Sequence, residues 1–263
     1  MSLAPYLSFV IPAYNEAERI APTLTGVGAY FRHQQGGVEV IVVDDGSTDA
    51  TAVIVAKMQP LLAAQGLALY LLRNPGNHGK GYSVRRGFLQ ARGDVVVFSD
   101  ADLSTPLTET PKLLGPLERG ECEAVIGSRD LPDSQIGVHQ SPWREFAGRS
   151  FNRFVRLLTG LPYADTQCGF KAFRREVFTP IFRAQRTTGF AFDVEILYLA
   201  RKAGVRVLEI PVVWNHAEGS KVGLNWRSIK PFWDVAALCW RDWRGGYAEL
   251  SATPFPSLSG CTK

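Results

Sequence analysis

The sequence predicts one α/β domain with a mostly parallel central sheet flanked by helices, followed by a C-terminal helical extension. Five short apolar runs, several of them rich in Val and Ile, lack polar alternation, which is typical of strands buried on both faces of a parallel sheet. Helical patterns lie between these runs, and repeated strand–helix units place helices on both faces. The expected strands are Tyr6–Ile11, Val38–Val43, Leu67–Leu72, Val95–Ser99 and Ala124–Gly127. The expected helices are Glu16–Phe31, Thr48–Ala64, Lys80–Ala91 and Thr108–Arg119.

The second half of the chain has a less regular pattern, and no repeat or linker divides it from the first half. We expect a domain over residues 1–213, a helical extension over 214–250 and a disordered, Pro/Ser/Gly-rich tail over 251–263. The expected elements are a loop at Leu131–Gln140, a helix at Pro142–Thr159, a polar block at Asp165–Lys171, a helix at Phe190–Lys202, a strand at Val205–Val213 and a last helix at Arg227–Arg241.

Composition excludes several classes of protein. The 263 residues are 46% hydrophobic and 21% charged, which fits a globular rather than a disordered chain. The net charge of +4 comes without a basic stripe, so no nucleic-acid partner is expected. Four scattered Cys favour a reducing cytosol over a disulfide framework. The N-terminus lacks a signal-peptide pattern, and no apolar stretch of about 18 residues occurs, so we expect no membrane-spanning segment.

The motif Asp100-Ala101-Asp102 directly follows the strand pattern VVVFS. Ligands of such sheets bind at the carboxyl ends of the strands. Two carboxylates two positions apart can both turn toward one hard cation, and Mg²⁺ or Mn²⁺ prefers oxygen ligands. The alternative is a solvated turn with a helix-capping Asp, which D-x-D alone does not exclude.

Two further strand ends are polar. Asp44 and Asp45 end the second strand, where carboxylates can accept hydrogen bonds from a ribose hydroxyl or a base N–H. The first strand ends in Pro12-Ala13-Tyr14-Asn15-Glu16, in which Tyr14 could lie against a base. Asn15 could instead be a simple helix N-cap.

The segment Asn74–Gly81 is rich in Gly and begins a helix, so its backbone can approach phosphate while Lys80 adds positive charge. It is neither a Walker A loop nor a G-x-G-x-x-G fingerprint, which argues against a dinucleotide-binding fold. His78 is interpreted as a loop residue rather than a metal ligand.

Taken in order and spacing, P-x-Y-N-E, V-V-D-D-G-S-T-D, N-x-G-x-x-G-K-G and D-A-D-L-S resemble a family 2 glycosyltransferase with the GT-A fold over about Leu7 to Val213. The resemblance implies a nucleotide-diphosphate sugar donor and a divalent metal, Mg²⁺ or Mn²⁺, held by Asp100 and Asp102. The residues expected to bind the nucleotide sugar are Pro12, Tyr14, Glu16, Asp44, Asp45, Lys80, Asp100, Ala101 and Asp102.

Two blocks of the second half, D-T-Q-C-G-F-K from Asp165 and F-A-F-D-V-E from Phe190, resemble the dolichyl-phosphate β-glucosyltransferase branch. The two blocks resemble the related dolichyl-phosphate mannosyltransferases almost as well. The resemblance implies UDP-glucose as donor, a dolichyl or polyprenyl monophosphate as acceptor, and inversion at the anomeric carbon. It also implies an acceptor-phosphate site around Arg129 and Arg144, and the charge of Lys171 makes it a further candidate for that site.

The nature of the acceptor decides whether a base is needed. A phosphate monoester is mostly a dianion at neutral pH, so it needs cations, whereas a sugar hydroxyl needs a general base. We expect Asp102, Asp165 and Asp193 to act in catalysis, with Asp165 holding a loop or an arginine and Asp193 orienting the sugar or acceptor. Structural ion pairs are an equal alternative for both, and Glu195 is a candidate for one with Arg174 or Arg175.

Four Trp in the last helix are spaced by 7, 7 and 3 positions and so share one face: Trp226, Trp233, Trp240 and Trp243. Basic residues flank them, as in an interfacial helix. The stripe either packs on the sheet or on a second subunit, or it lies on a membrane surface. If the acceptor is a lipid, contact of the stripe with a membrane surface predicts a peripheral enzyme on the cytoplasmic face of a membrane. The alternatives to the glucosyltransferase are a GDP-mannose enzyme, transfer to a soluble glycan, and a non-catalytic sugar-nucleotide binding protein.

Overall fold

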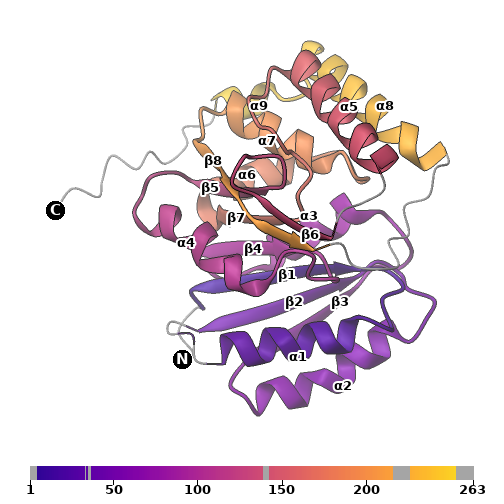
Figure 1. Ribbon diagram of the computed structural model, residues 1–263, viewed down its shortest axis with the longest axis vertical. Coiled ribbons are helices and arrows are strands. Elements are labelled where there is room, and N and C mark those ends of the chain that lie inside the picture. The colour runs from indigo at the N-terminus through magenta and orange to yellow at the C-terminus, as the bar shows by residue number, and fades with distance from the viewer. Residues whose placement is uncertain (1–4, 33, 35–36, 139–141, 216–225, 253–263) are drawn as a thin grey trace.

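The computed structural model describes residues 5–32, 34, 37–138, 142–215 and 226–252, and its centre is a seven-stranded sheet (Figure 1). The strand order is β3-β2-β1-β4-β7-β5-β8. All neighbours pair in parallel except β7, which runs antiparallel to both β4 and β5. The strands are β1 (Leu7–Ala13), β2 (Val38–Asp44), β3 (Ala68–Arg73), β4 (Val95–Ser99), β5 (Ala124–Ser128), β7 (Phe170–Arg174) and β8 (Val207–Pro211). The prediction of a mostly parallel α/β sheet is confirmed.

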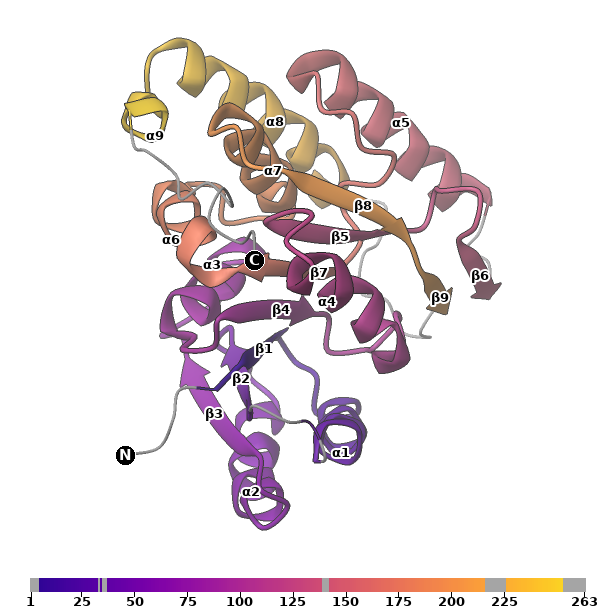
Figure 2. The ribbon, with the colours of Figure 1, turned by 90° about the vertical axis from the view of Figure 1, so that its left-hand side faces the viewer.

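Helices cover both faces of the sheet (Figure 2). One face packs against three helices, α1 (Ile20–Phe31), α2 (Thr51–Ala63) and α4 (Thr110–Glu118), the last preceded by a 3₁₀ turn at Leu107–Glu109. The helices of the other face are α3 (Lys80–Gln90), α5 (Pro142–Thr159), α6 (Arg175–Ala184), α7 (Phe192–Lys202), α8 (Trp226–Trp243) and α9 (Ala248–Ala252). Successive strand residues alternate between the two cores, because Phe9 and Ile11 join the first and Val10 joins the second.

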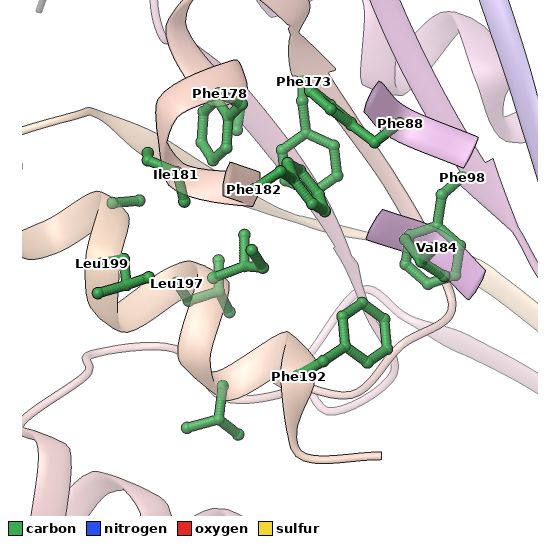
Figure 3. Close-up of a cluster of buried hydrophobic side chains, with 14 of the residues drawn as sticks. Val84, Phe88, Phe98, Phe173, Phe178, Ile181, Phe182, Phe192, Leu197 and Leu199 are labelled. Atoms are coloured by element: carbon green, nitrogen blue, oxygen red, sulfur yellow. The ribbon is translucent and has the colours of Figure 1, made fainter. Parts of the chain in front are cut away.

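The second core joins the two halves of the chain through aromatic side chains (Figure 3). Phe88 of α3 stacks on Phe182 of α6, with ring centroids 3.9 Å apart, and both rings contact Phe173 of β7. Phe98 of β4 lies against Phe192 at the start of α7. The strands that carry the donor-side motifs are therefore braced by elements from residues 170–202.

The structure differs from the sequence-based prediction in three places within residues 131–189. The expected loop at Leu131–Gln140 contains the strand β6 (Gln135–Val138), which pairs with β9 (Val213–Asn215). Strand β7 and helix α6 were not predicted at all. Lys171 interrupts the apolar pattern of β7, and Pro180 lies inside α6, so neither segment has the usual signal of its element.

Helix α8 presents three of its tryptophans outward. Val235 and Leu238 are buried in the second core, whereas Trp233, Trp240 and Trp243 are 65%, 58% and 82% exposed. The alternative in which this stripe packs on the sheet is therefore wrong for these three residues. The side chain of Trp226 lies outside the described residues. Among those that are described, no helix combines the length and apolar character needed to cross a bilayer.

Candidate active site

The carboxyl ends of β1, β2 and β4 lie side by side, and the loops that follow them are tied together by hydrogen bonds. The backbone N–H of Asn15 donates to Ser47 Oγ at 2.9 Å, and that of Glu16 donates to Thr51 Oγ1 at 2.8 Å. Asn15 has a φ of 54°, and its side chain accepts from the backbone of Thr48. It bridges two loops and does not cap α1, which begins at Ile20. The N-cap alternative is wrong.

Asp45 organises the loop between β3 and α3. Its carboxylate accepts from Asn74 Nδ2 at 2.7 Å, from the backbone N–H of His78 at 3.0 Å and from that of Gly79 at 2.8 Å. A Cβ on Gly46 would come within 2.5 Å of the Gly76 backbone, so only glycine permits this approach. The loop that begins α3 is thus held in place by a buried acid.

The remaining nucleotide candidates surround this loop. Asp44 is fully buried, and its Oδ1 accepts from the Ser47 backbone at 3.1 Å. Its Oδ2 has no hydrogen-bond donor among the described residues, although Arg73 Nε lies 3.5 Å away. Tyr14 is 38% exposed, and Glu16 pairs with Arg19 at 2.7 Å. Pro12 lies half-buried within β1.

The D-x-D turn projects its carboxylates toward the start of α3. Lys80 Nζ lies 2.6 Å from Asp100 Oδ1, while Asp102 Oδ1 accepts from the Ser104 backbone at 3.0 Å. Ala101 is buried, and its carbonyl accepts from Thr23 of α1, which anchors the turn. Burial lowers the pKa of Lys80, but the charges of Asp100 and other nearby carboxylates outweigh it, so the pKa lies above its ordinary value.

Gly169, which the sequence reasoning did not single out, completes this turn. Its carbonyl accepts from the Asp100 backbone at 3.2 Å, and a Cβ on it would lie 2.0 Å from Asp100 Oδ2. Any side chain here would displace the carboxylate. A glycine directly before the first residue of a strand is a sign of close approach, but the signal is visible only once β7 is known to be a strand.

Lys171 and Asp193 form a buried ion pair. Lys171 Nζ lies 2.6 Å from Asp193 Oδ1 and donates to the Cys168 carbonyl at 2.5 Å, and the two residues are only 1% and 4% exposed. Burial raises the pKa of Asp193 above its ordinary value, and the charge of Lys171 opposes this only in part. Lys171 is therefore occupied by an internal partner, and its role toward an acceptor phosphate stays a prediction.

Arg129 and Asp165 form a second pair, with two parallel hydrogen bonds of 2.6 and 2.9 Å. Asp165 is fully buried, and the Arg129 guanidinium lies over the ring of Trp214 at 5.7 Å. Burial alone would raise the pKa of Asp165, but the charge and hydrogen bonds of Arg129 hold it below its usual range. The geometry is that of an acid that holds an arginine. The Arg144 side chain lies outside the described residues.

Glu195 has partners that the sequence did not indicate. It accepts from the backbone N–H groups of Arg186 and Thr187, and also from Arg241 and the Tyr247 hydroxyl. The expected partners Arg174 and Arg175 bond to backbone carbonyls instead. Glu195 thus fastens the C-terminal helices to the loop before α7.

The donor set fits a divalent cation that completes its shell with ligand oxygens. No group of three or more His, Cys, Asp or Glu side chains converges within the part of the chain that the structure describes. Asp100 and Asp102 are partly exposed carboxylates on one turn, and Gly169 leaves room beside Asp100. Mg²⁺ is commonly held in this way, by one or two carboxylates together with substrate phosphates.

The fold and this site define a class of enzyme. Residues 8–182 match the profile of glycosyl transferase family 2, so the chain belongs to this family and is a glycosyltransferase. It is 36% identical over 229 residues to dolichyl-phosphate beta-glucosyltransferase ALG5C of Trichomonas vaginalis, covering 84% of this chain and 67% of the relative. The Saccharomyces cerevisiae dolichyl-phosphate beta-glucosyltransferase is 33% identical over 246 residues, covering 89% and 74%. The human one is 33% identical over 237 residues, covering 86% and 70%.

Solved structures support the GT-A fold. Glucosyl-3-phosphoglycerate synthase from Mycobacterium tuberculosis with UDP has a TM-score of 0.64 at 21% identity, covering 89% of this chain and 80% of that one. Mannosyl-3-phosphoglycerate synthase from Rubrobacter xylanophilus has a TM-score of 0.64 at 21% identity, covering 92% and 74%. The mycobacterial enzyme has also been solved with Mn²⁺, UDP-glucose and phosphoglyceric acid, and that structure has a TM-score of 0.61 at 20% identity, covering 89% and 80%.

Proposed function

We propose that this glycosyltransferase moves glucose from UDP-glucose to a dolichyl or polyprenyl monophosphate with inversion at the anomeric carbon. The observation that carries the proposal is the arrangement of charge along one sheet edge. Asp100 follows β4, Arg129 follows β5, and the start of β7 lies between them. Two strand spacings separate the two positions by roughly 10 Å, the scale of a diphosphate sugar lying between donor and acceptor groups.

The donor side of the edge suits a nucleotide diphosphate. The Oδ2 of Asp44, which accepts no hydrogen bond from the described residues, is an acceptor for a ribose hydroxyl or base N–H, and the exposed ring of Tyr14 offers a surface for a base. Asp45 keeps the loop at Asn74–Gly79 close to this position through three hydrogen bonds. Lys80, at the first position of α3, carries its positive charge toward the diphosphate.

Departure of the nucleotide diphosphate builds negative charge at the D-x-D turn. A divalent ion, Mg²⁺ or Mn²⁺, held by Asp100 and Asp102 supplies Lewis-acid stabilisation of that charge when bound. Lys80 contributes a second cation, and its raised pKa keeps it protonated over the physiological range. The position of the turn is fixed by two hydrogen bonds, from Thr23 of α1 to the Ala101 carbonyl and from the Asp100 backbone to the Gly169 carbonyl before β7.

The acceptor side suits a phosphate monoester. Such a group is already a dianion near neutral pH, so its oxygen can attack the anomeric carbon without a general base. Arg129 matches phosphate oxygens through its planar fork, and the buried Asp165 fixes the orientation of that fork. Attack opposite the leaving diphosphate converts an α-linked donor into a β-linked product.

Transfer is tested by incubating the chain with radiolabelled nucleotide sugars, Mg²⁺ and polyprenyl phosphate, then extracting with organic solvent. We expect label from UDP-glucose in the organic phase, dependent on the lipid and absent with EDTA, and a product cleaved by a β-glucosidase. If only GDP-mannose gave labelled product, the proposed donor would be wrong. If label appeared only on a soluble glycan, the proposed acceptor would be wrong. Retention of UDP-glucose with no transfer to any acceptor would make the chain a binding protein and overturn the proposal.

We further propose that the exposed face of α8 lies on the cytoplasmic surface of a membrane, where a lipid acceptor would be met. Trp240 and Trp243 are exposed, and Arg244 lies over the Trp240 ring at 5.1 Å, an aromatic and basic mixture suited to anionic headgroups. Vesicles containing anionic lipid should carry the chain upward in a flotation assay. The double variant Trp240→Ser/Trp243→Ser should lose flotation, while Leu61→Ser on α2 should float as the wild type does. Equal flotation of the double variant and the Leu61 variant would refute membrane contact through α8.

A further inference from the structure

A cavity of about 610 Å³ opens beside α3, the end of α6 and α9, which lie next to one another (Figure 2). Tyr82 and Arg85 of α3 line one side of it, and Arg183 and Arg186 line another. None of the residues proposed above for the donor, the metal or the acceptor belongs to its lining. The cavity is therefore separate from the candidate active site, although α3 borders both.

The lining is rich in positive charge. Three guanidiniums face one carboxylate, that of Glu249. Arg183 and Arg186 are exposed, and neither forms an ion pair with a carboxylate in the described parts of the chain. Arg85 donates to the carbonyls of Phe182 and Arg183, which holds its side chain against the end of α6. Guanidinium groups gathered in this way favour phosphate, whose oxygens match their planar fork.

Gln185 provides a second, independent observation, a buried amide oxygen that accepts no hydrogen bond from the described residues. It lines the cavity, is only 2% exposed, and donates from Nε2 to the carbonyls of Gly81 at 2.9 Å and Thr187 at 2.8 Å. Its Oε1 is buried without a donor among the described residues, which is a costly state for an amide oxygen. A hydroxyl-bearing ligand, acting through a bridging water or a small shift of the side chain, would supply that donor.

The same contacts connect the cavity to the donor site. Gly81, which Gln185 holds, directly follows Lys80, and the backbone N–H of Tyr82 donates to the Thr188 carbonyl at 3.2 Å. A Cβ on Gly79 would lie 2.5 Å from that same carbonyl oxygen. The start of α3 and the loop at residues 185–188 are therefore packed so closely that a displacement of one moves the other.

We propose that this cavity is a second binding site, specific for a small phosphate-bearing molecule, and that its occupancy alters the position of Lys80. Arg183 and Arg186 bind the phosphate oxygens, and Gln185 transmits occupancy to the first turn of α3. The effect on the donor rests on the proposed function, whereas phosphate binding at the cavity does not.

Binding is measured by isothermal titration with inorganic pyrophosphate and, separately, with glycerol 3-phosphate. EDTA is present throughout, so that the carboxylates of Asp100 and Asp102 hold no metal to attract these probes. We expect saturable binding that weakens at least tenfold in Arg183→Glu and in Arg186→Glu. Lys57→Glu, on the exposed side of α2, is the matched charge reversal and should bind as the wild type does. No saturable binding, or equal affinity in all four proteins, would overturn the site.

The link to α3 has its own readout. Hydrogen exchange of the amides in residues 79–84 should slow by at least threefold on addition of glycerol 3-phosphate, whose hydroxyls can reach Gln185, to the wild type, and should not change in Arg183→Glu. An exchange rate that does not change in a protein shown to bind glycerol 3-phosphate would refute the transmission. Neither measurement uses transferase activity. A failure to transfer sugar in the transferase assay would therefore count against the proposed function but not against this second binding site.

Discussion

Asp45 on the donor side of the candidate site and two buried acids on the acceptor side are held by different means. On the donor side, Asp45 is satisfied by backbone N–H groups and an amide, all from one neighbouring loop. On the acceptor side, Asp165 and Asp193 are satisfied by the charges of Arg129 and Lys171, which come from other strands. Hydrogen bonds from one loop to an acid fix the shape of that loop, whereas a buried ion pair makes two distant segments depend on each other. The donor side should therefore tolerate isosteric changes that the acceptor side does not.

The largest effect is expected from Lys171→Met, which leaves the buried carboxyl group of Asp193 without its ion-pair partner. Loss of one partner of a buried pair costs about 3–5 kcal/mol of unfolding free energy, measured by urea denaturation. Adding Asp193→Leu should recover most of it. Lys230→Met breaks an exposed pair with Asp234 and should cost no more than about 0.5 kcal/mol. A comparable cost for the two lysines would show that burial does not distinguish them.

Asp102→Asn addresses the donor side. Asn keeps an oxygen that accepts from the Ser104 backbone, so the unfolding free energy should change by less than about 0.5 kcal/mol. Transferase turnover should nevertheless fall roughly 100- to 1,000-fold, because a neutral amide holds the divalent cation that offsets the charge of the leaving diphosphate less well than a carboxylate does. Asp133→Asn, at an exposed position, is the control. Near-normal turnover in the Asp102 variant would remove this residue from the site.

Gly169→Ala tests the contact at which the two sides meet. Its Cβ would lie 2.0 Å from Asp100 Oδ2, so the carboxylate must rotate away from Lys80. We expect turnover to drop about tenfold and stability to drop by about 1 kcal/mol, as for modest overpacking. Gly148→Ala, where a Cβ meets no atom, should leave turnover intact. The prediction fails if both alanine variants turn over equally well.

A pH dependence of stability tests the pair of Arg129 and Asp165 on the acceptor side. Because Arg129 depresses the pKa of Asp165 in the folded protein, its contribution is present above about pH 4, the pKa of an unfolded Asp, and is lost as the pH falls toward the lower folded value. Each pH unit in that range removes up to about 1.4 kcal/mol. Urea unfolding at pH 5 and pH 3 should show a smaller difference in Asp165→Asn than in Asp133→Asn. Identical pH slopes in both variants would contradict the assignment.

The sequence was informative where structure is local. Strands β1, β2 and β4 are buried along nearly their whole length, so their sequences are mostly apolar, and the polar residues after them had to meet at one sheet edge. That rule brought together Asp45, Asp100 and Lys80. It did not reveal that Asp45 holds the loop at Asn74–Gly79, because two of the loop's three donors are backbone groups, which carry no residue signature.

Prediction failed where an element is stabilised from a distance. Strand β7 has Lys171 at its second position, which is acceptable in a core only because Asp193 of α7 neutralises it. Glu195 was expected to pair with Arg174 or Arg175, but its side chain instead accepts hydrogen bonds from Tyr247 and Arg241 of the C-terminal extension. Both partnerships span more than 20 residues, beyond the range of any local pattern.

The sequence by itself determined the strand–helix alternation, the strand-end acids and the amphipathic C-terminal helix, because periodicity and turn chemistry depend on residues close along the chain. Only the tertiary structure decided that β7 enters the sheet antiparallel between β4 and β5, that Gly169 leaves space for Asp100, and that three tryptophans of α8 face outward. The physical reason is that a buried charge, a close contact and an exposed face are each defined by what packs against them, and those partners lie far away in sequence.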